Sequence, residues 1–466
     1  MPLAKRPCVQ CKEKHVKCDE ARPKCRRCQT RNLTCTRPAK KTVFRNASTA
    51  PFNNDQRWVS GEIKECESMC LTTPPIVDPS MLRTPVALMD TGAGHGKAQT
   101  QTHPFDLCDE KRHFQLVVPI RARQHPPLLY AIFALAARHL TRLPRFKTPN
   151  GILYQGQLLP NLTPHDAVEY TLKCIPALRD FHTIQDDERL ESIIATAVIL
   201  RQLEEIDDDE DDGEERQGTP GENPGESRPK TKVNFLAIID AVLRSAPSQT
   251  LFGRRSLIQA AYWMAVRQEI FHSFTRRHPP QMTLEPEYGQ GASNANKIVL
   301  HTAQVAKWRL SDRSEQEWLR LQKQGEQLDK EALVDIQPFF TRQADRSNGE
   351  IFPIIWYSSA LEVTSIQLSL IAKMVLMAEN PFLSQSTTRA RWREIENEVR
   401  RMILDLCGIS LCHPACPPAL VHTAFGMELY GDFFTDHYER LALRGVVEKF
   451  RDARAWPVKK LSSMFQ

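Results

Sequence analysis

Residues 8–35 read CVQCKEKHVKCDEARPKCRRCQTRNLTC, and the six cysteines in this stretch decide how the start of the chain folds. They form two triplets with the same spacing, C-x2-C-x6-C, and a shift of 17 residues places the first triplet on the second. The six cysteines are Cys8, Cys11, Cys18, Cys25, Cys28 and Cys35. Such a repeat within 28 residues indicates a compact metal-binding unit.

The surroundings of these cysteines favour metal ligands over disulfides. Lys5 and Arg6 are followed by cysteines and further charge, not by the apolar stretch of a secretion signal. The longest apolar run, residues 128–137, is about half as long as a membrane-spanning helix. We therefore expect an intracellular protein with no membrane partner, in which closely spaced cysteines stay reduced and bind metal.

Zinc is the metal that six thiolates suit best, because it prefers four tetrahedral ligands and binds sulfur well. Two zinc ions need eight ligand positions, so six cysteines suffice if two of them bridge both ions. The twofold repeat favours one bridge from each triplet. The alternative is a single zinc ion held by the two Cys-x2-Cys pairs, which would leave Cys18 and Cys35 unused.

The positive charge of the chain is concentrated around the cysteines. Residues 1–45 hold 14 lysines and arginines against 3 aspartates and glutamates, whereas the rest of the chain holds 48 against 53. A basic segment of this kind indicates a polyanionic partner. Residues 1–43 contain no Phe, Tyr or Trp on which RNA bases could stack, so double-stranded DNA is the expected partner.

The spacing of the cysteines resembles that of the fungal zinc binuclear cluster, Zn2Cys6, of transcription factors. Pro23, two residues before Cys25, and Asp19, directly after Cys18, fit the same pattern. The resemblance implies two zinc ions per chain, with Cys8 and Cys25 as the bridging pair and two short helices around the metals. It also implies that the first helix lies in the DNA major groove and reads a CGG-like triplet.

The predicted DNA contacts are basic side chains in both halves of the cluster. Lysine side chains can donate hydrogen bonds to guanine O6 and N7 in the major groove. They can also contact the phosphates of the DNA backbone. His15 stands where the family usually has a lysine that reads a base. This departure weakens the expectation of a CGG preference but not the expectation of DNA binding. The predicted contacts are Lys12, Lys14, His15, Lys17, Arg26 and Arg27. A basic patch of Arg37, Lys40 and Lys41 is a candidate nuclear-import signal, so we expect a nuclear protein.

The rest of the chain separates into a linker and a helical body. The predicted domains are the cluster at 1–45, a linker rich in Pro, Gly and Thr at 46–105, and a large all-α regulatory domain at 106–466. An acidic insertion at about 205–232 is predicted to be a solvated loop or an activation segment. The periodicity predicts helices at 127–140, 165–178, 188–204, 234–245, 255–277, 298–324, 354–378, 387–407, 417–435 and 438–451.

Four stretches of this body, at 126–140, 260–274, 407–411 and 455–461, resemble the fungal-specific transcription factor domain of ARCA-like cysteine-cluster proteins. A second metal site made of Cys407, Cys412, His413 and Cys416 is an alternative to that structural role, although no Cys-x2-Cys pair occurs there.

The leading functional prediction is a sequence-specific DNA-binding transcription factor that regulates RNA polymerase II transcription. The alternative is a zinc-dependent scaffold that binds other proteins or RNA. No HExxH, GxSxG, phosphate-loop or dinucleotide pattern occurs, so the protein is predicted not to be an enzyme. Transcriptional co-regulators or a small-molecule effector are the expected partners of the helical body.

Overall fold

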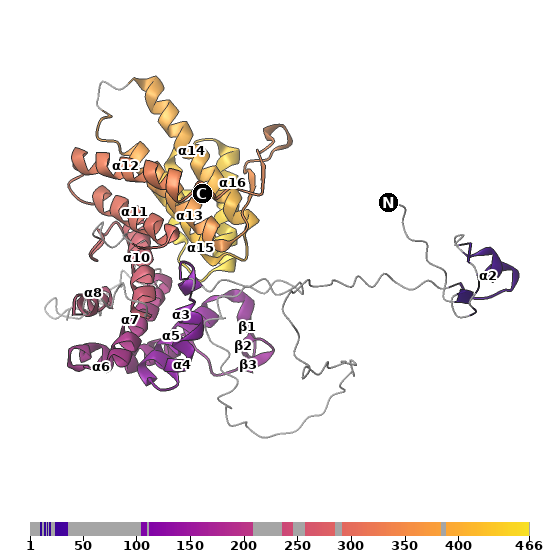
Figure 1. The fold of residues 1–466 in the computed structure, drawn as a ribbon, viewed down its shortest axis with the longest axis horizontal. Coiled ribbons are helices and arrows are strands. Elements are labelled where there is room, and N and C mark those ends of the chain that lie inside the picture. Colours follow the sequence, from indigo (N-terminus) through magenta and orange to yellow (C-terminus); the bar gives the residue numbers. More distant parts are fainter. Residues whose placement is uncertain are drawn as a thin grey trace, which may run out of the picture. The chain divides into compact units, whose positions relative to one another are not determined.

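The structure is a computed structural model that describes the chain in segments. The described residues are 10, 11, 14, 16, 18, 19, 24–35, 104–109, 111–207, 235–245, 257–284, 291–383 and 388–465. Contacts divide the chain into two compact units, Met1–Ile76 and Val77–Gln466. The first unit holds the cysteine segment with helix α2 (Arg26–Thr30), and the second holds the helical body (Figure 1).

The body is built mainly from helices. Its longer described helices are α5 (Pro126–Arg142), α6 (Pro164–Arg179), α7 (Asp187–Asp207), α8 (Phe235–Ser245), α10 (Leu257–Arg276), α11 (Asn294–Arg309), α12 (Glu315–Glu331), α13 (Ala360–Ala378), α14 (Arg389–Cys412), α15 (Pro417–Tyr430) and α16 (His437–Ala453). Shorter ones are α3 (His113–Leu116), α4 (Val118–Ala122) and α17 (Lys459–Met464). Short 3-10 helices are η3 (Pro104–Asp106), η4 (Pro144–Phe146), η5 (Phe181–Thr183), η7 (Arg346–Asn348) and η8 (Gly431–Phe433).

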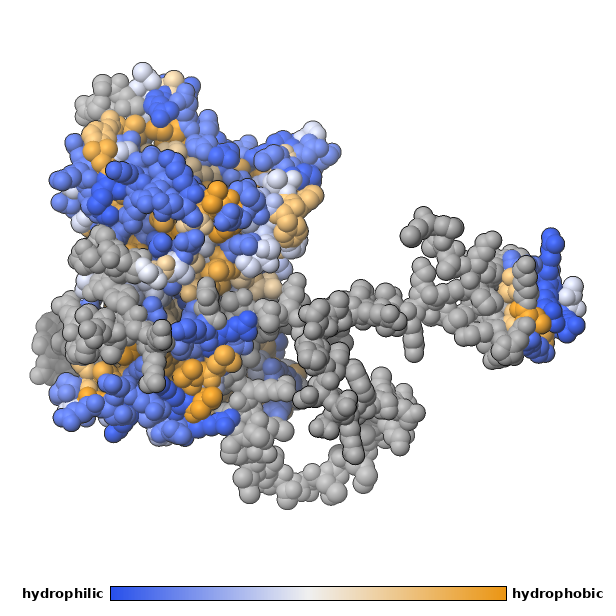
Figure 2. All heavy atoms as spheres, viewed as in Figure 1, coloured by the Kyte–Doolittle hydropathy of each residue, from blue (hydrophilic) through white to orange (hydrophobic). Residues whose placement is uncertain are grey.

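The helices of the body share one apolar core. Figure 1 shows α11 to α16 gathered at one end and α4 to α6 at the other, with α7 and α10 between them. The largest cluster of buried apolar side chains takes residues from every long helix named above. The face of the body drawn in Figure 2 is mostly hydrophilic, with small apolar patches.

Helix α13 is long and apolar enough to cross a membrane, the one described helix of which this holds. It packs against α11, α12, α14 and α15, and 56% of its most apolar 18-residue window is buried inside the body. Burial among four helices accounts for its apolar composition.

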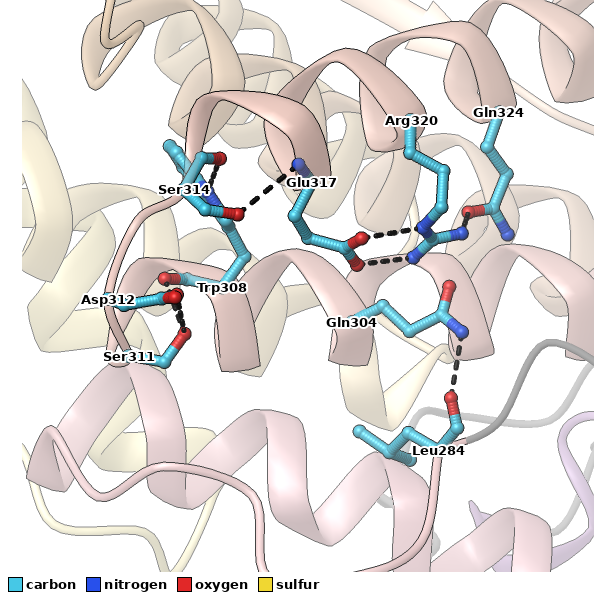
Figure 3. Close-up of polar contacts among 9 residues, drawn as sticks. All are labelled: Leu284, Gln304, Trp308, Ser311, Asp312, Ser314, Glu317, Arg320 and Gln324. Carbon is cyan, nitrogen blue, oxygen red and sulfur yellow. Dashed lines mark hydrogen bonds and ion pairs between the residues drawn. The ribbon is translucent and has the colours of Figure 1, made fainter.

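The prediction of one continuous helix at 298–324 is wrong, because a capped turn separates α11 from α12 (Figure 3). Ser314 is the N-cap of α12, and its Oγ accepts a hydrogen bond from the backbone N–H of Glu317 at 3.3 Å. The indole Nε1 of Trp308 donates to the carbonyl of Ser314 at 3.0 Å. A serine at this position favours the N-terminus of a new helix over the interior of an old one.

The all-α prediction for the body is wrong in two places, where short antiparallel sheets form. The first sheet has the order β1 (Lys147–Thr148), β2 (Gly151–Tyr154) and β3 (Gln157–Leu159). Gln155 and Gly156 form the two-residue β2–β3 turn, with φ of 48° and 79°. Left-handed backbone at both turn positions matches the twist of a hairpin.

The second sheet corrects the helix predicted at 354–378. Strand β4 (Phe340–Arg342) pairs with β5 (Ile354–Trp356), so α13 begins only at residue 360. Helix α14 packs directly against β5. Gly408 allows this approach, because a Cβ at this position would lie 2.3 Å from the carbonyl oxygen of Pro353.

The acidic insertion predicted at about 205–232 begins later than expected. Its first residues belong to α7, where Glu204 and Glu205 are buried. Arg201 Nη1 donates to Glu204 Oε2 at 2.5 Å, and Gln202 Nε2 donates to Glu205 Oε2 at 2.5 Å. These partners let two acidic side chains enter the body. Most of the predicted insertion lies outside the described residues.

Candidate metal centre and DNA-binding unit

Three buried cysteine sulfurs lie together in the first unit. The Sγ atoms of Cys11, Cys25 and Cys28 are all within 4.8 Å of one another, and those of Cys11 and Cys25 are 3.8 Å apart. Two thiolates at about 2.3 Å from one tetrahedral zinc ion would be separated by about 3.8 Å. The arrangement of these sulfurs therefore fits a shared zinc ion.

Cys25 also belongs to a second group of potential ligands. Its Sγ, the Sγ of Cys18 and a carboxylate oxygen of Asp19 lie within 4.8 Å of one another. Within the described part of the chain, Cys25 is the only residue common to the two groups. It is thus placed between two neighbouring ligand sets.

The repeat in the sequence is also a repeat in the backbone. The N–H of Val16 donates to the carbonyl of Cys11 at 3.0 Å, and 17 positions later the N–H of Leu33 donates to the carbonyl of Cys28 at 2.9 Å. A second bond repeats with the same offset, from Lys14 N–H to Gln10 O (3.4 Å) and from Arg31 N–H to Arg27 O (3.3 Å). These two backbone bonds therefore recur at equivalent described positions of the two halves.

Val16 and Leu33 have a role that the sequence analysis missed. Both are half-buried and pack against the cluster of cysteines. They occupy equivalent positions in the two triplets, so the 17-residue shift that aligns the cysteines would have identified them. Together they place an apolar side chain against the sulfurs from each half.

Backbone N–H groups point at two of the sulfurs. Cys28 N–H donates to Cys25 Sγ, and Cys25 N–H donates to Cys35 Sγ, both at 3.4 Å. Cys25 is the N-cap of α2, so its sulfur lies at the positive end of that helix. Such bonds orient the sulfurs of metal ligands.

Asp19 joins the two halves of the unit. Both of its carboxylate oxygens accept from the backbone N–H of Arg26, each at 3.1 Å. This bond satisfies an N–H at the start of α2, a helix of five residues that is too short to persist alone. The bonds to Arg26 give Asp19 the role of a cap of α2. Its closeness to Cys18 and Cys25 also makes it a candidate metal ligand.

Two substitutions of Asp19 separate these roles. Asp19→Asn retains an oxygen that accepts from Arg26 and should leave zinc retention almost unchanged, because the carboxylate acts as a cap. Asp19→Ala should weaken the unit by about 1 kcal/mol, the usual cost of losing a cap. Competition with a chromophoric chelator measures zinc retention. Equal and large losses in both variants would instead identify Asp19 as a ligand.

The other predicted site residues divide between described and undescribed positions. Among the predicted metal ligands, Cys8 lies outside the described residues, and Cys35 is half-buried. Among the predicted DNA contacts, Lys14 and Arg26 are exposed and Arg27 is half-buried. The predicted residues outside the described ones are Lys12, His15, Lys17, Arg37, Lys40 and Lys41.

In the second metal site considered for the body, both ring nitrogens of His413 already make hydrogen bonds. Nδ1 of His413 lies 2.7 Å from the carbonyl oxygen of Ile409, and Nε2 accepts from the N–H of Tyr357 at 3.0 Å. Burial raises the pKa of Cys407 far above its usual value, which disfavours the thiolate that a metal needs. Within the described part of the body, these residues do not form a ligand group.

Comparison with protein families matches residues 6–42 to the fungal Zn(2)-Cys(6) binuclear cluster domain. The matched range contains all six cysteines of the repeat. Domains of this kind bind zinc and are typical of fungal DNA-binding transcription factors. The chain therefore carries a Zn2Cys6 domain at its N-terminus, followed by a mostly helical body. Comparisons with curated proteins and with solved structures found no match to the chain.

Proposed function

We propose that this protein is a nuclear, sequence-specific DNA-binding factor that regulates transcription by RNA polymerase II. The observation that carries the proposal is the match of residues 6–42 to the binuclear cluster domain, whose sulfurs here have a spacing that fits zinc. The helical body is proposed to regulate that activity, through a co-regulator or a small molecule, and to perform no catalysis. Its resemblance to the fungal-specific transcription factor domain supports this division of roles.

The proposed cofactor is a pair of zinc ions held by the six cysteines, with Cys8 and Cys25 as bridges. The place of Cys25 in both ligand groups supports a bridging role. Zinc would supply the cross-link that such short helices lack, so metal binding and folding of this unit are expected to be coupled. Two zinc ions and six thiolates contribute −2 to a segment whose formal charge is +11, so it stays strongly basic.

The proposed DNA contact is the helix that follows Cys11, lying in the major groove. Lys12, Lys14, His15 and Lys17 would face base edges and phosphates there, while Arg26 and Arg27 would contact the second half of the site. The exposure of Lys14 supports this assignment. A CGG-like half-site is proposed, with His15 weakening the contact that a lysine would make to guanine.

The structural repeat supplies a matched pair of substitutions for testing this function. Lys14 and Arg31 occupy equivalent exposed positions in the two halves. Lys14→Ala should lower the affinity for the selected site by about 1–3 kcal/mol, with little change on random DNA, because it removes a base contact. Arg31 is not among the predicted contacts and is proposed here as a phosphate contact. Arg31→Ala should therefore weaken binding to both DNAs alike and lower the slope of log affinity against log salt concentration by about one.

The measurement has two stages. Selection of binding sites from random duplex DNA with the zinc-loaded chain gives the preferred sequence, and titrations at several salt concentrations then compare the two variants. Identical effects of both substitutions on selected and random DNA would contradict the assignment of the reading helix. A wild-type chain without preference for any duplex would favour the scaffold alternative.

A further inference from the structure

A polar pocket with a volume of about 280 Å³ lies between the connection from β4 to β5, helix α14 and the first turn of α16. Helix α14 is in contact with both β5 and α16 (Figure 1). The volume is almost twice the roughly 150 Å³ of a protein cavity that holds a benzene molecule, so a small organic molecule fits. The charged residues of its wall are Arg346, Arg400, Arg401, Asp405 and Glu439.

Three of these residues, Arg346, Arg400 and Glu439, form a positive group. Glu439 is buried, and it binds both arginines: Nη2 of Arg346 lies 3.1 Å from Oε1, and Nη2 of Arg400 donates to Oε2. Two guanidinium groups against one carboxylate leave a formal charge of +1. The buried Nε of Arg400 has no hydrogen-bond partner in the described part of the chain. A buried donor without a partner is costly and indicates a missing acceptor.

A negative group is formed on α14 by Arg401, Asp405 and the neighbouring Glu398. Arg401 donates to Glu398 through Nε at 3.0 Å and through Nη2, while its Nη1 lies 3.7 Å from Asp405 Oδ2. One guanidinium group against two carboxylates leaves a formal charge of −1. A separation of 3.7 Å is too long for a hydrogen bond, and Asp405 accepts none from the residues that the structure describes.

The carboxylate of Asp405 lowers the stability of the body. Its side chain is only 20% exposed, and burial raises its pKa to about 6. A folded-state pKa above the usual value of a carboxyl means that ionisation is less favourable in the folded chain than in the unfolded one. At neutral pH Asp405 is still mostly ionised, so it destabilises the fold where an uncharged amide would not. Strongly perturbed groups of this kind are typical of binding sites.

The two groups together favour an occupant that carries both charges. Their formal charges of +1 and −1 cancel, so the arginines attract a simple anion that Asp405 repels, and a simple cation meets the reverse. A zwitterion places each of its charges beside the group of opposite sign and gains a charge-assisted hydrogen bond at both. Arg400 and Asp405 are five positions apart, about 7.5 Å along the axis of α14, so several bonds must separate the two charges.

We propose that this pocket binds a small amino acid zwitterion, with its ammonium at Asp405 and its carboxylate at Arg346 and Arg400. The carbon chain between them would contact Ile351 and Leu404, which also line the pocket. The proposal rests on the proposed function only in naming the ligand an effector. Binding is measured without DNA, so its failure is distinct from a failure of DNA recognition.

The test uses γ-aminobutyrate as the probe and the zinc-loaded full chain as the target. Ligand-observed NMR titrations at low salt compare it with three molecules that have the same four-carbon chain. Butyrate lacks the ammonium, butylamine lacks the carboxylate, and 1,4-butanediol is uncharged. γ-Aminobutyrate is expected to bind saturably at one site and at least about fivefold more tightly than each of the three, because it alone gains both charge-assisted bonds.

A matched pair of aspartate substitutions tests the ammonium contact. Asp405→Asn should lower the affinity for γ-aminobutyrate to the level of butyrate. It should not unfold the body, because it removes a carboxylate whose ionised form is disfavoured by burial. Asp329→Asn is the control, because Asp329 pairs with Lys373 at 2.8 Å and does not line the pocket. It removes the same charge from the chain and should leave binding unchanged.

A matched pair of arginine substitutions tests the carboxylate contact. Arg346 is 49% exposed and Arg313 is 52% exposed. Each pairs with a glutamate, Glu439 or Glu379, that a second arginine also binds. Arg346→Gln should weaken binding of both γ-aminobutyrate and butyrate by about fivefold, the loss of one charge-assisted bond. Arg313→Gln should leave both unchanged, because Arg313 lies outside the lining of the pocket.

Each contrary outcome overturns the proposal. It fails if γ-aminobutyrate does not bind saturably, or if butyrate, butylamine or 1,4-butanediol binds as tightly, which would indicate a plain anion, cation or polyol site. It also fails if Asp405→Asn and Asp329→Asn affect γ-aminobutyrate equally. If a variant does not fold, the comparison of the four ligands on the unmodified chain still decides the question.

Discussion

Replacing Cys25 with serine should remove both metal ions from the N-terminal unit and lower the affinity for specific DNA by at least about 100-fold. Cys25 lies in both groups of potential ligands, caps α2 and donates its N–H to Cys35 Sγ. A serine hydroxyl is a far weaker zinc ligand than a thiolate. The binding free energy of structural zinc, about 10–16 kcal/mol in small zinc domains, is also the folding free energy of such a unit.

The measurement combines zinc analysis with DNA binding on the purified full chain. The unmodified protein is expected to carry two zinc ions per chain, and Cys25→Ser fewer than one. Cys412→Ser is the control, because Cys412 is a half-buried cysteine of the body. It should keep both ions and full DNA affinity. One zinc ion in the unmodified chain, or an unchanged zinc content in Cys25→Ser, would refute the bridged cluster.

Gly408→Ala should lower the free energy of unfolding of the body by about 3 kcal/mol, the upper part of the range for overpacking. A Cβ at this position would lie 2.3 Å from the carbonyl oxygen of Pro353 and 3.1 Å from its Cγ. Rotation of a side chain cannot relieve a clash with a backbone atom. Helix α14 would have to move away from β5, which would open the interface that buries Ile409 beside Ile355.

Gly445→Ala is the matched control for this substitution. Gly445 lies inside α16, and a Cβ there would meet no atom within 4 Å. Alanine at such a site should raise the stability by up to about 1 kcal/mol, since it favours the helix over the unfolded chain. The midpoint of thermal unfolding reports both changes. Similar shifts in the two variants would show that the contact with Pro353 does not limit packing.

The sequence predicts the N-terminal domain well because its structure is set by local spacing. The distances between cysteines along the chain determine which sulfurs can share a metal ion. The family match at 6–42 confirms a Zn2Cys6 domain there, and the sulfurs of Cys11, Cys25 and Cys28 lie together as that spacing requires. The zinc stoichiometry and the bridging role of Cys8 stay predictions.

In the body, the sequence predicts where long helices occur better than where they stop. The helical periodicity of apolar residues shows that a segment has a buried face. Because this periodicity continues from α11 into α12, it gave no sign of the turn between them. The signal that separates them is chemical, a serine N-cap and a tryptophan that bonds to it. The two-residue turn at Gln155 and Gly156 was missed for a related reason, since strands of three or four residues show no clear alternation.

A pocket lined by residues of α7, α10 and α15 could not be predicted from the sequence at all. Glu205, Gln268 and His422 belong to three helices, and no local pattern places them around one space. Glu205 was assigned to a solvated acidic segment because its neighbours are acidic. Only the packing of α7 against α10 shows that this carboxyl lies in the interior.

The backbone repeat in the cysteine unit means that conformation and recognition are separate properties of each half. The same two hydrogen bonds and the same apolar contact hold each half, while the exposed side chains differ, with a lysine at 14 and an arginine at 31. We therefore expect exchange of the exposed residues 14 and 31 to alter DNA contacts more than the backbone bonds that the two halves share. Such a tandem frame offers a route to engineered proteins that present two reading surfaces from fewer than forty residues.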